Sequence, residues 1–344
     1  KKRRDPDKEK LTQFHMDIAA SIQVVLEDIT ILLAKSIKQT TGAKNLCLAG
    51  GVALNCVANG KILREMIFDQ IWIQPASGDA GTCLGAGLIA HYDISGKERI
   101  VNKDDSMKGA FLGPRFSNES IKHYLQEVNA KYYFLEDHEL FTQLGKLLSQ
   151  GNVIGWFNGC MEFGPRALGG RSIIGDPRNL KMQSVMNLKI KYRESFRPFA
   201  PSVLREDLSK WFDLNVDSPY MLLVADVKKN IQIPMSEQNQ KLFGIDKLNI
   251  KRSSIPAVTH VDYSARVQTV HKETNKKYYE LLKEFKQITG CPLLVNTSFN
   301  VRGEPIVCSV EDSFKCFMGT NLDILVCENF ILFKEEQNKS LLQD

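Results

Sequence analysis

The chain has 344 residues, a length typical of two domains or of one large domain. Hydrophobic residues make up 43% and charged residues 25%, as in ordinary globular proteins, and a net charge of only +5 excludes a polycation. The eight cysteines are dispersed without a CxxC pair, which excludes a disulfide framework and indicates reduced thiols in a cytoplasmic protein. We expect no membrane span, because no stretch reaches roughly 18 apolar residues.

The first hundred residues alternate between helical and extended patterns. Each predicted strand ends in a glycine-containing loop that leads into a helix. A strand–loop–helix pattern used twice predicts an α/β layer with ligands at the strand ends. In chain order, we expect a helix over 11–39, a strand over 45–49, a helix over 52–66, a strand over 71–74 and a helix from 81 to 90.

A polar segment over 93–113 is the predicted linker to a second α/β domain. Residues 228–254 are predicted to be a long exposed insertion. The predicted division is 1–108, 109–335 and a tail over 336–344. In the second domain we expect helices over 118–129, 137–149, 274–289 and 310–319, and strands over 131–135, 153–157, 220–226, 257–261, 293–297 and 323–327.

Positive charge is concentrated between Gly164 and Arg197, where eight basic residues face two acidic ones and leave a charge of +6. Glycines interrupt this window and allow backbone N–H groups to approach a ligand, while arginines bind phosphate oxygens bidentately. The window therefore predicts an anion pocket. Two alternatives remain: a solvated basic face, and a nucleic-acid surface on which Tyr192 and Phe196 stack bases, which the low overall charge disfavours.

A second polar cluster follows the strand predicted over 293–297. Asn296, Ser298 and Asn300 alternate, so an extended chain would point them to one side, and Arg302 follows. The alternative is a capped turn, because Asn and Ser favour turns.

Together these segments resemble the ATP-dependent O-carbamoyltransferase family, which includes the tobramycin, cephalosporin and nodulation-factor carbamoyltransferases. The resemblance covers nearly the whole chain. Its segments occur in the family's order and are GGVALN (50–55), PASGDAG (75–81), MEFGPRALGGRS (161–172), FRPFAP (196–201) and VNTSFNVRGEP (295–305).

The resemblance implies the second half of an actin-like ATPase domain over 1–108, followed by a YrdC-like α/β domain over 109–335 that binds carbamoyl phosphate. The released carbamate reacts with ATP to give carbamoyl-adenylate, which carbamoylates a hydroxyl of a small molecule. The implied residues for the phosphate and carbamoyl oxygens are Arg166, Arg171, Lys191, Arg193 and Arg197. The residues implied to bind the amide and phosphate of carbamoyl phosphate are Asn296, Ser298, Asn300 and Arg302. The residues implied to bind the nucleotide are Gly50, Gly51, Asn55 and Gly78.

The family also implies a divalent metal, iron, held by one aspartate, here Asp79, and by the two histidines of an HxxxH pair. This sequence has no such pair, since His15 lacks a histidine four residues away, and Cys160 stands where many members have arginine. We therefore expect a fragment, or a chain that works as a homodimer or with a partner supplying the other half. The alternatives are a tRNA-binding YrdC-like module and a non-catalytic subunit of a split enzyme.

Overall fold

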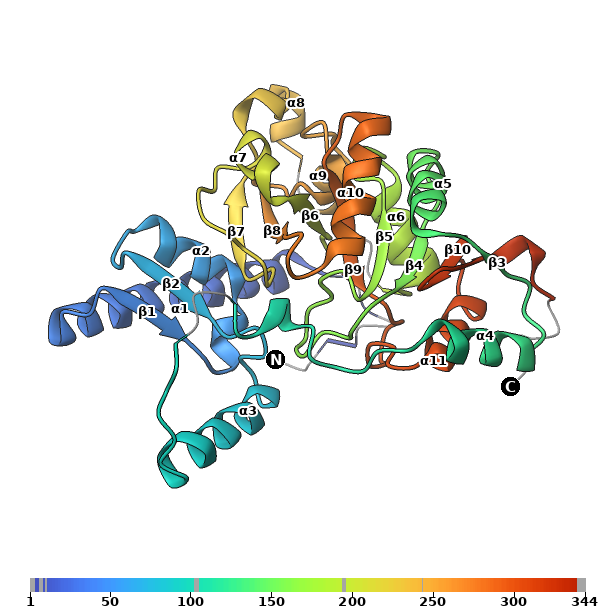
Figure 1. The fold of residues 1–344 in the computed structure, drawn as a ribbon. Helices are drawn as coiled ribbons and strands as arrows, with labels where there is room; N and C mark the ends of the chain where they lie inside the picture. The colour runs from blue at the N-terminus through green and yellow to red at the C-terminus, as the bar shows by residue number, and fades with distance from the viewer. Residues whose placement is uncertain are drawn as a thin grey trace.

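The computed structural model describes residues 4–5, 9, 11–101, 105–193, 196–242 and 244–338. This described part has a mixed α/β fold with a two-stranded parallel sheet and a nine-stranded mixed sheet (Figure 1). Within it, no helix has both the length and the apolar character needed to cross a membrane. The helices are α1 (Gln13–Thr41), α2 (Cys56–Arg64), α3 (Ala80–Ile89), α4 (Asn118–Glu127), α5 (Asp137–Ser149), α6 (Met182–Val185), α7 (Leu208–Trp211), α8 (Glu237–Gln240), α9 (Ile245–Leu248), α10 (Lys276–Thr289) and α11 (Val310–Met318). The strands are β1 (Asn45–Leu48), β2 (Gln70–Ile73), β3 (Tyr133–Phe134), β4 (Ile154–Phe157), β5 (Arg171–Gly175), β6 (Ala200–Leu204), β7 (Leu223–Asp226), β8 (Ser264–Val270), β9 (Leu293–Ser298), β10 (Ile324–Cys327) and β11 (Phe330–Phe333).

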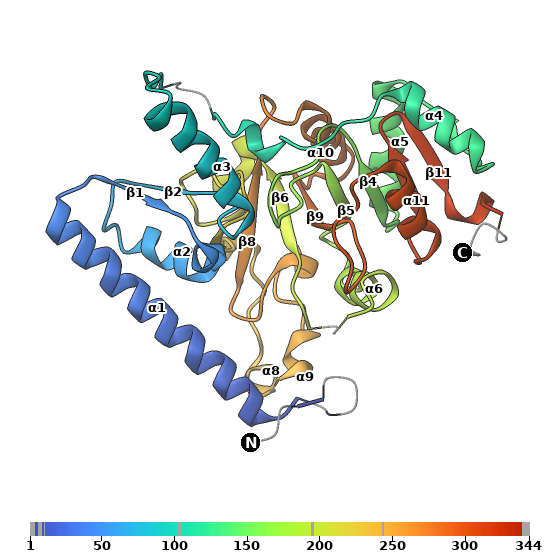
Figure 2. The ribbon, with the colours of Figure 1, turned by 90° about the horizontal axis from the view of Figure 1, so that it is seen from below.

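The N-terminal part is a small layer built on the parallel pair β1–β2. Helix α1 ends at Gly42, whose φ of 64° is the left-handed conformation common at helix ends. Helices α1 and α2 lie on one face of β1–β2 and α3 lies on the other (Figures 1 and 2). Helices α1 and α2 share a small core with β1, which contains Ile31, Leu46 and Ile62. Much of the apolar face of α1 stays exposed, including 66% of Leu32.

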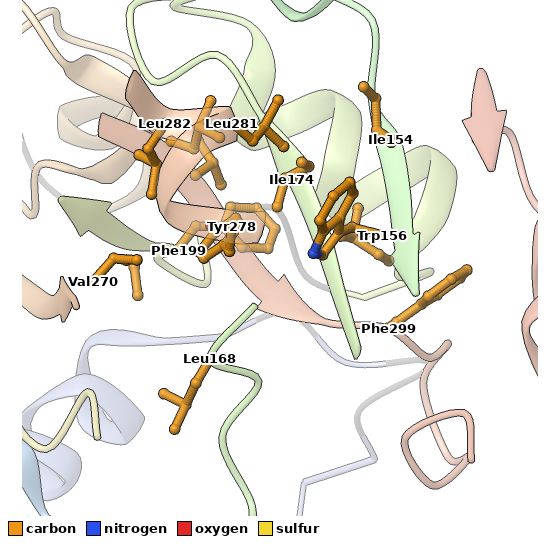
Figure 3. Packing of buried hydrophobic residues seen from close by; sticks show 14 of the residues in the cluster. Ile154, Trp156, Leu168, Ile174, Phe199, Val270, Tyr278, Leu281, Leu282 and Phe299 are labelled. Carbon is orange, nitrogen blue, oxygen red and sulfur yellow. The ribbon is translucent and has the colours of Figure 1, made fainter. Parts of the chain in front are cut away.

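The large sheet has the order β3-β11-β10-β4-β5-β9-β6-β8-β7 among the described residues. Helices α5 and α10 cover one face, and α4 and α11 cover the other (Figures 1 and 2). Aliphatic side chains make up most of the core between sheet and helices, and aromatic rings pack among them (Figure 3). The rings of Trp156 and Tyr278 lie 6.4 Å apart, and both side chains are fully buried.

The register of the central strands joins the segments that the sequence analysis singled out. Strand β9 pairs antiparallel with both β5 and β6, so that Ser172 lies opposite Ser298 and Ala200 lies opposite Asn296. The segments 161–172, 196–201 and 295–305 therefore meet at the middle of one sheet, although more than a hundred residues separate the first from the last.

Several predicted elements differ from the structure. The strand predicted over 257–261 is wrong, because Pro256–Val258 forms a 3-10 helix and proline cannot donate to a strand ladder. The insertion over 228–254 is not wholly exposed, since Arg252 is 2% exposed and donates to the carbonyl oxygens of Thr259 and His260. Within the predicted tail, buried Gln337 exchanges hydrogen bonds with the backbone of Lys131. Residues 339–344 lie outside the described part.

Candidate anion-binding site

The segment 161–172 lies between the N-terminal layer and the large sheet. Gly164, with φ 143°, approaches the next segment so closely that a Cβ atom would lie 2.8 Å from the carbonyl oxygen of Pro75. Arg166 donates from Nη2 to the carbonyl oxygen of Leu54 at 3.4 Å. The N–H of Phe163 donates to the carbonyl oxygen of Ala110 at 2.7 Å. This segment therefore contacts both candidate nucleotide loops and the predicted linker.

Glu162 organises the backbone of the same segment. Its carboxylate is 5% exposed, and Oε1 accepts from the N–H groups of Leu168 at 2.6 Å, Gly170 at 2.7 Å and Arg171 at 3.4 Å. Hydrogen bonds to a carboxylate are stronger than those between neutral groups, so Glu162 fixes the loop that leads into β5. The sequence analysis assigned no role to Glu162, and its place within the segment was the only signal.

Arg171 is fully buried and is held by backbone carbonyl groups. Its guanidinium donates to Gly170 at 2.9 Å, Gly159 at 3.1 Å and Pro114 at 2.9 Å, and it stacks 3.6 Å above the Phe157 ring. Burial lowers the pKa of Arg171, while the Glu162 carboxylate opposes that shift. Arg171 was expected to bind the phosphate, but its guanidinium N–H groups donate to backbone carbonyl oxygens.

Asn296 also differs from its expected position. Its side-chain N–H group donates to the carbonyl oxygen of Ala167 at 3.0 Å, to Ser202 Oγ at 3.0 Å and to Gln268 Oε1 at 2.8 Å. Gln268 in turn donates to the carbonyl oxygen of Leu168 at 2.7 Å. This buried network fastens the 161–172 segment to the sheet, and Asn296 does not line the cavity that Ser298 and Asn300 line.

Six of the predicted residues do meet at one cavity of about 210 Å³. Among the described residues, neither Arg166, Arg171 nor Asn296 lines it. The lining is Lys191, Arg193, Arg197, Ser298, Asn300, Val301, Arg302 and Gly303, which we call the Lys191 cavity.

Lys191 lines this cavity and is 3% exposed. Its Nζ donates to the carbonyl oxygens of Ser298 at 2.7 Å and Asn300 at 2.8 Å, and also to Asn300 Oδ1 at 2.5 Å. Burial, together with the nearby charge of Arg193, lowers the pKa of Lys191 to about 7. The oxygens favour the ammonium form and attach the loop after β9 to Lys191.

The local backbone brings the other cations to the same cavity. A π-helix over Met186–Ile190 precedes Lys191, and Tyr192 follows it with a left-handed φ of 47°. Such helices are rare and occur often at functional sites. Buried Asn187 accepts from Arg193 Nε at 2.7 Å and donates to the carbonyl oxygen of Arg197 at 2.9 Å. Asn187 therefore positions both arginines, a role that the sequence did not indicate.

Arg197 and Arg302 are exposed residues that line the cavity. The N–H of Arg302 donates to the carbonyl oxygen of Lys191 at 3.2 Å, which ties the two halves of the cavity together. Three arginines and a lysine can bind a small, doubly charged anion here through charge-assisted hydrogen bonds.

The predicted nucleotide residues lie in the N-terminal layer, away from the Lys191 cavity lining. Gly50 has a φ of 92°, and no atom lies within 4 Å of a Cβ built at Gly50 or Gly51. A Cβ at Gly78 would contact Leu54 at 3.9 Å. Asn55 caps α2 by accepting from the N–H of Ala58 at 3.0 Å, so its side chain has a structural role. The two adjacent glycines leave open space beside the backbone, as a nucleotide loop requires.

The implied metal is not matched by the residues present. Asp79 is exposed at the start of α3. Across residues 4–338, apart from the undescribed gaps, no three His, Cys, Asp or Glu side chains come close enough to hold a metal ion. His15 instead bonds Thr12 Oγ1 at 2.8 Å. We therefore derive no chemical step through a metal.

Two family models and several curated proteins match this chain. The family model described as "Carbamoyltransferase C-terminus" matches residues 145–334, and "Carbamoyltransferase N-terminus" matches residues 1–88. An uncharacterized protein of Synechocystis is 60% identical over 97% of this chain and 55% of that protein. Nodulation protein NolO of Bradyrhizobium diazoefficiens is 39% identical over 94% of this chain and 55% of that protein.

Among solved structures, full-length HypF in its phosphate- and nucleotide-bound form matches 59% of this chain and 22% of that chain, with 15% identity and a TM-score of 0.35. The chain spans about half the length of the curated relatives it matches.

Proposed function

Because the chain belongs to the carbamoyltransferase family, we propose that the Lys191 cavity binds carbamoyl phosphate for ATP-dependent O-carbamoylation of a small-molecule hydroxyl. The observation that carries this proposal is the meeting of Lys191, Arg193, Arg197 and Arg302 at one small cavity. We also propose that residues 109–335 form a YrdC-like domain and that the N-terminal layer is half of an actin-like ATPase domain.

The charge of the cavity supports a phosphate ligand. Lys191 is buried among neutral oxygens, and the nearby Arg193 repels it, so both cations are more stable beside an anion. Arginine guanidinium groups match the geometry of phosphate oxygens, and Arg197 and Arg302 are exposed at the cavity. These two side chains are the ones that we expect to contact the phosphate group from the open side.

The proposed chemistry begins with hydrolysis of carbamoyl phosphate to carbamate and phosphate. Preorganised cations stabilise the negative charge that develops on the leaving phosphate oxygen. Carbamate oxygen then attacks the α-phosphate of ATP, which forms carbamoyl-adenylate and releases pyrophosphate. Attack of the acceptor hydroxyl on the carbamoyl carbon releases AMP and gives the carbamoylated product.

Calorimetric titration with carbamoyl phosphate tests the binding step. Arg302→Ala removes one charge-assisted contact from an exposed position, so we expect about tenfold weaker affinity for carbamoyl phosphate. This loss lies near the low end of the contribution of about 1.5–3 kcal/mol that a hydrogen bond to a charged group makes. Lys181→Ala is the matched control, because Lys181 belongs to the same basic window and is exposed outside the cavity lining. Absence of heat with the unmodified chain contradicts the proposal, as does salt-sensitive RNA binding without carbamoyl phosphate binding.

A further inference from the structure

A second and much larger cavity is bounded by both the N-terminal layer and the large sheet. Its volume is about 1360 Å³, against about 210 Å³ for the Lys191 cavity. Its walls come from β2, the predicted linker, the loops before β7 and α10, the loop after β4 and the β10–β11 turn. Among the described residues, the two cavities share no lining residue. We call the larger one the Trp72 cavity.

The Trp72 cavity borders the place where two segments of the family resemblance meet. It is lined by Ile73, the last residue of β2 before the 75–81 loop, and by Cys160, which precedes the 161–172 segment. These two segments touch, since a Cβ atom at Gly164 would lie 2.8 Å from the carbonyl oxygen of Pro75. A ligand in this cavity lies beside both the proposed nucleotide loop and the 161–172 segment, as the acceptor of the proposed reaction must.

An aromatic side chain is available for stacking in this cavity. Trp72 lines it and is 42% exposed. Tyr220 lines the same wall, and its hydroxyl donates to Asp105 Oδ1 at 2.6 Å. The Asp105 carboxylate also accepts from the N–H groups of Met107 at 2.9 Å and Gly109 at 2.7 Å. This network ties the linker to the loop before β7, so this part of the cavity wall is formed before a ligand binds.

The charged groups of the lining pair with one another. Arg205 Nη2 lies 2.6 Å from Asp217 Oδ2, and Lys277 Nζ lies 3.1 Å from Glu328 Oε2. Buried Glu328 also accepts from the N–H of Gly159 at 2.8 Å. Paired charges attract an anion weakly, in contrast to the four cations of the Lys191 cavity. They place hydrogen-bond donors and acceptors side by side, which suits a neutral ligand that carries several hydroxyl groups.

Strained backbone gathers around the Trp72 cavity. Lys108 and Glu328 line it with left-handed φ values of 50° and 49°, and Met221, between two lining residues, has a φ of 57°. This conformation is unfavourable for residues other than glycine and clusters at ligand sites. Tyr192, which has it too, adjoins Lys191 in the smaller cavity. The distribution favours a ligand site over a defect in packing.

We propose that the Trp72 cavity binds a neutral saccharide, the acceptor of the carbamoyl group, with one sugar ring stacked on Trp72. The inference deepens the proposed function and rests on it for the reaction. The C–H face of a sugar ring packs on an aromatic face, and the paired side chains bind its hydroxyl groups. The cavity volume exceeds the roughly 300–1,000 Å³ of sites for drug-sized ligands, so a saccharide of several rings fits.

The transfer step balances without a further reactant. An acceptor hydroxyl oxygen forms a bond to the carbamoyl carbon of carbamoyl-adenylate. The bond from that carbon to the adenylate oxygen breaks, AMP leaves with the electron pair, and the hydroxyl proton passes to water.

Saturation-transfer NMR of the unmodified chain tests the saccharide site. Maltotriose, cellotriose and triacetylchitotriose are the probes, and glucose 6-phosphate is the charged comparison. We expect saturation of ring C–H protons in at least one trisaccharide. Absence of saturation in all three overturns the proposal, as does binding of glucose 6-phosphate alone.

Trp72→Ala supplies the second arm. Loss of the aromatic contact should weaken the bound trisaccharide about three- to tenfold, while Trp72→Phe keeps an aromatic face and most of the affinity. The thermal midpoint should stay unchanged, because Trp72 is exposed. Tyr133→Ala is the matched control, since Tyr133 is a comparably exposed aromatic residue in β3 outside the cavity lining. Unchanged trisaccharide affinity in folded Trp72→Ala overturns the stacking site.

The acceptor role and the proposed function fail in different ways. Mass spectrometry after incubation with carbamoyl phosphate and ATP should detect a carbamate ester of the saccharide that binds, and its absence overturns the acceptor role. Trisaccharide binding that depends on Trp72, without any carbamoyl phosphate binding, would refute the proposed function and support the saccharide site. An effect of Arg302→Ala on carbamoyl phosphate affinity, without trisaccharide binding, would refute the saccharide site alone.

Discussion

Replacing Arg171 by lysine keeps the positive charge and removes the planar guanidinium group that connects three segments of the chain. The guanidinium bonds the carbonyl oxygens of Gly159, Gly170 and Pro114 and stacks on Phe157. One ammonium group cannot reach both Gly159 and Pro114 in that geometry. Loss of two charge-assisted bonds at about 1.5–3 kcal/mol each, reduced by local relaxation, lowers the free energy of unfolding by about 3 kcal/mol.

Urea denaturation of Arg171→Lys measures this loss, and calorimetry of the folded variant measures its affinity for carbamoyl phosphate. We expect the affinity to change by less than about threefold, since Arg171 does not line the Lys191 cavity. Arg252→Lys is the matched control, because buried Arg252 also holds carbonyl groups and lies elsewhere. An affinity loss above about tenfold with unchanged stability would show that Arg171 binds the phosphate directly.

Two further predictions concern pH and backbone geometry. Burial places the pKa of Lys191 near 7 in the folded protein, against 10.5 ordinarily, so the unfolded chain binds more protons between these values. The free energy of unfolding therefore rises from about pH 7 to about pH 10. Over the same range the affinity for carbamoyl phosphate falls, because Lys191 loses its charge. Calorimetry in buffers of different ionisation enthalpy should show proton uptake on binding. A pH-independent affinity, or stability that falls over this range, would contradict the assignment. Gly169 has a φ of 105°, and a Cβ atom there would overlap the Tyr278 ring, so Gly169→Ala should lower the free energy of unfolding by about 3 kcal/mol. Gly290 also has a left-handed φ but open space around it, so Gly290→Ala should lower it by about 1 kcal/mol. Denaturant unfolding measures both values. Equal losses would argue against the close packing of the 161–172 segment on α10.

The long amphipathic helices and the order of the motifs could be predicted from sequence, because both depend on local pattern. Helix α5 begins and ends at the predicted residues, and α10 and α11 lie within their predicted ranges. Strand β5 was missed because glycine and arginine in the basic window gave no alternating pattern, and β6, which begins just after that window, was missed with it. Their pairing with β9 is a long-range property of the sheet.

The candidate site was predicted in part for a similar reason. The sequence identified Lys191, Arg193 and Arg302 by residue type and position, and the structure brings them to one cavity. The direction of a buried side chain depends on its three-dimensional neighbours. The guanidinium group of Arg171 therefore donates to backbone carbonyl oxygens and does not line the cavity.

A crystal structure of the chain with bound carbamoyl phosphate tests the central claim most directly. We predict phosphate oxygens within about 3 Å of the guanidinium nitrogens of Arg197 or Arg302, on the cavity wall formed by Lys191. A ligand bound instead in the separate cavity of about 1360 Å³ lined by Trp72, Tyr220 and Lys277, with the Lys191 cavity lacking phosphate density, would contradict the account.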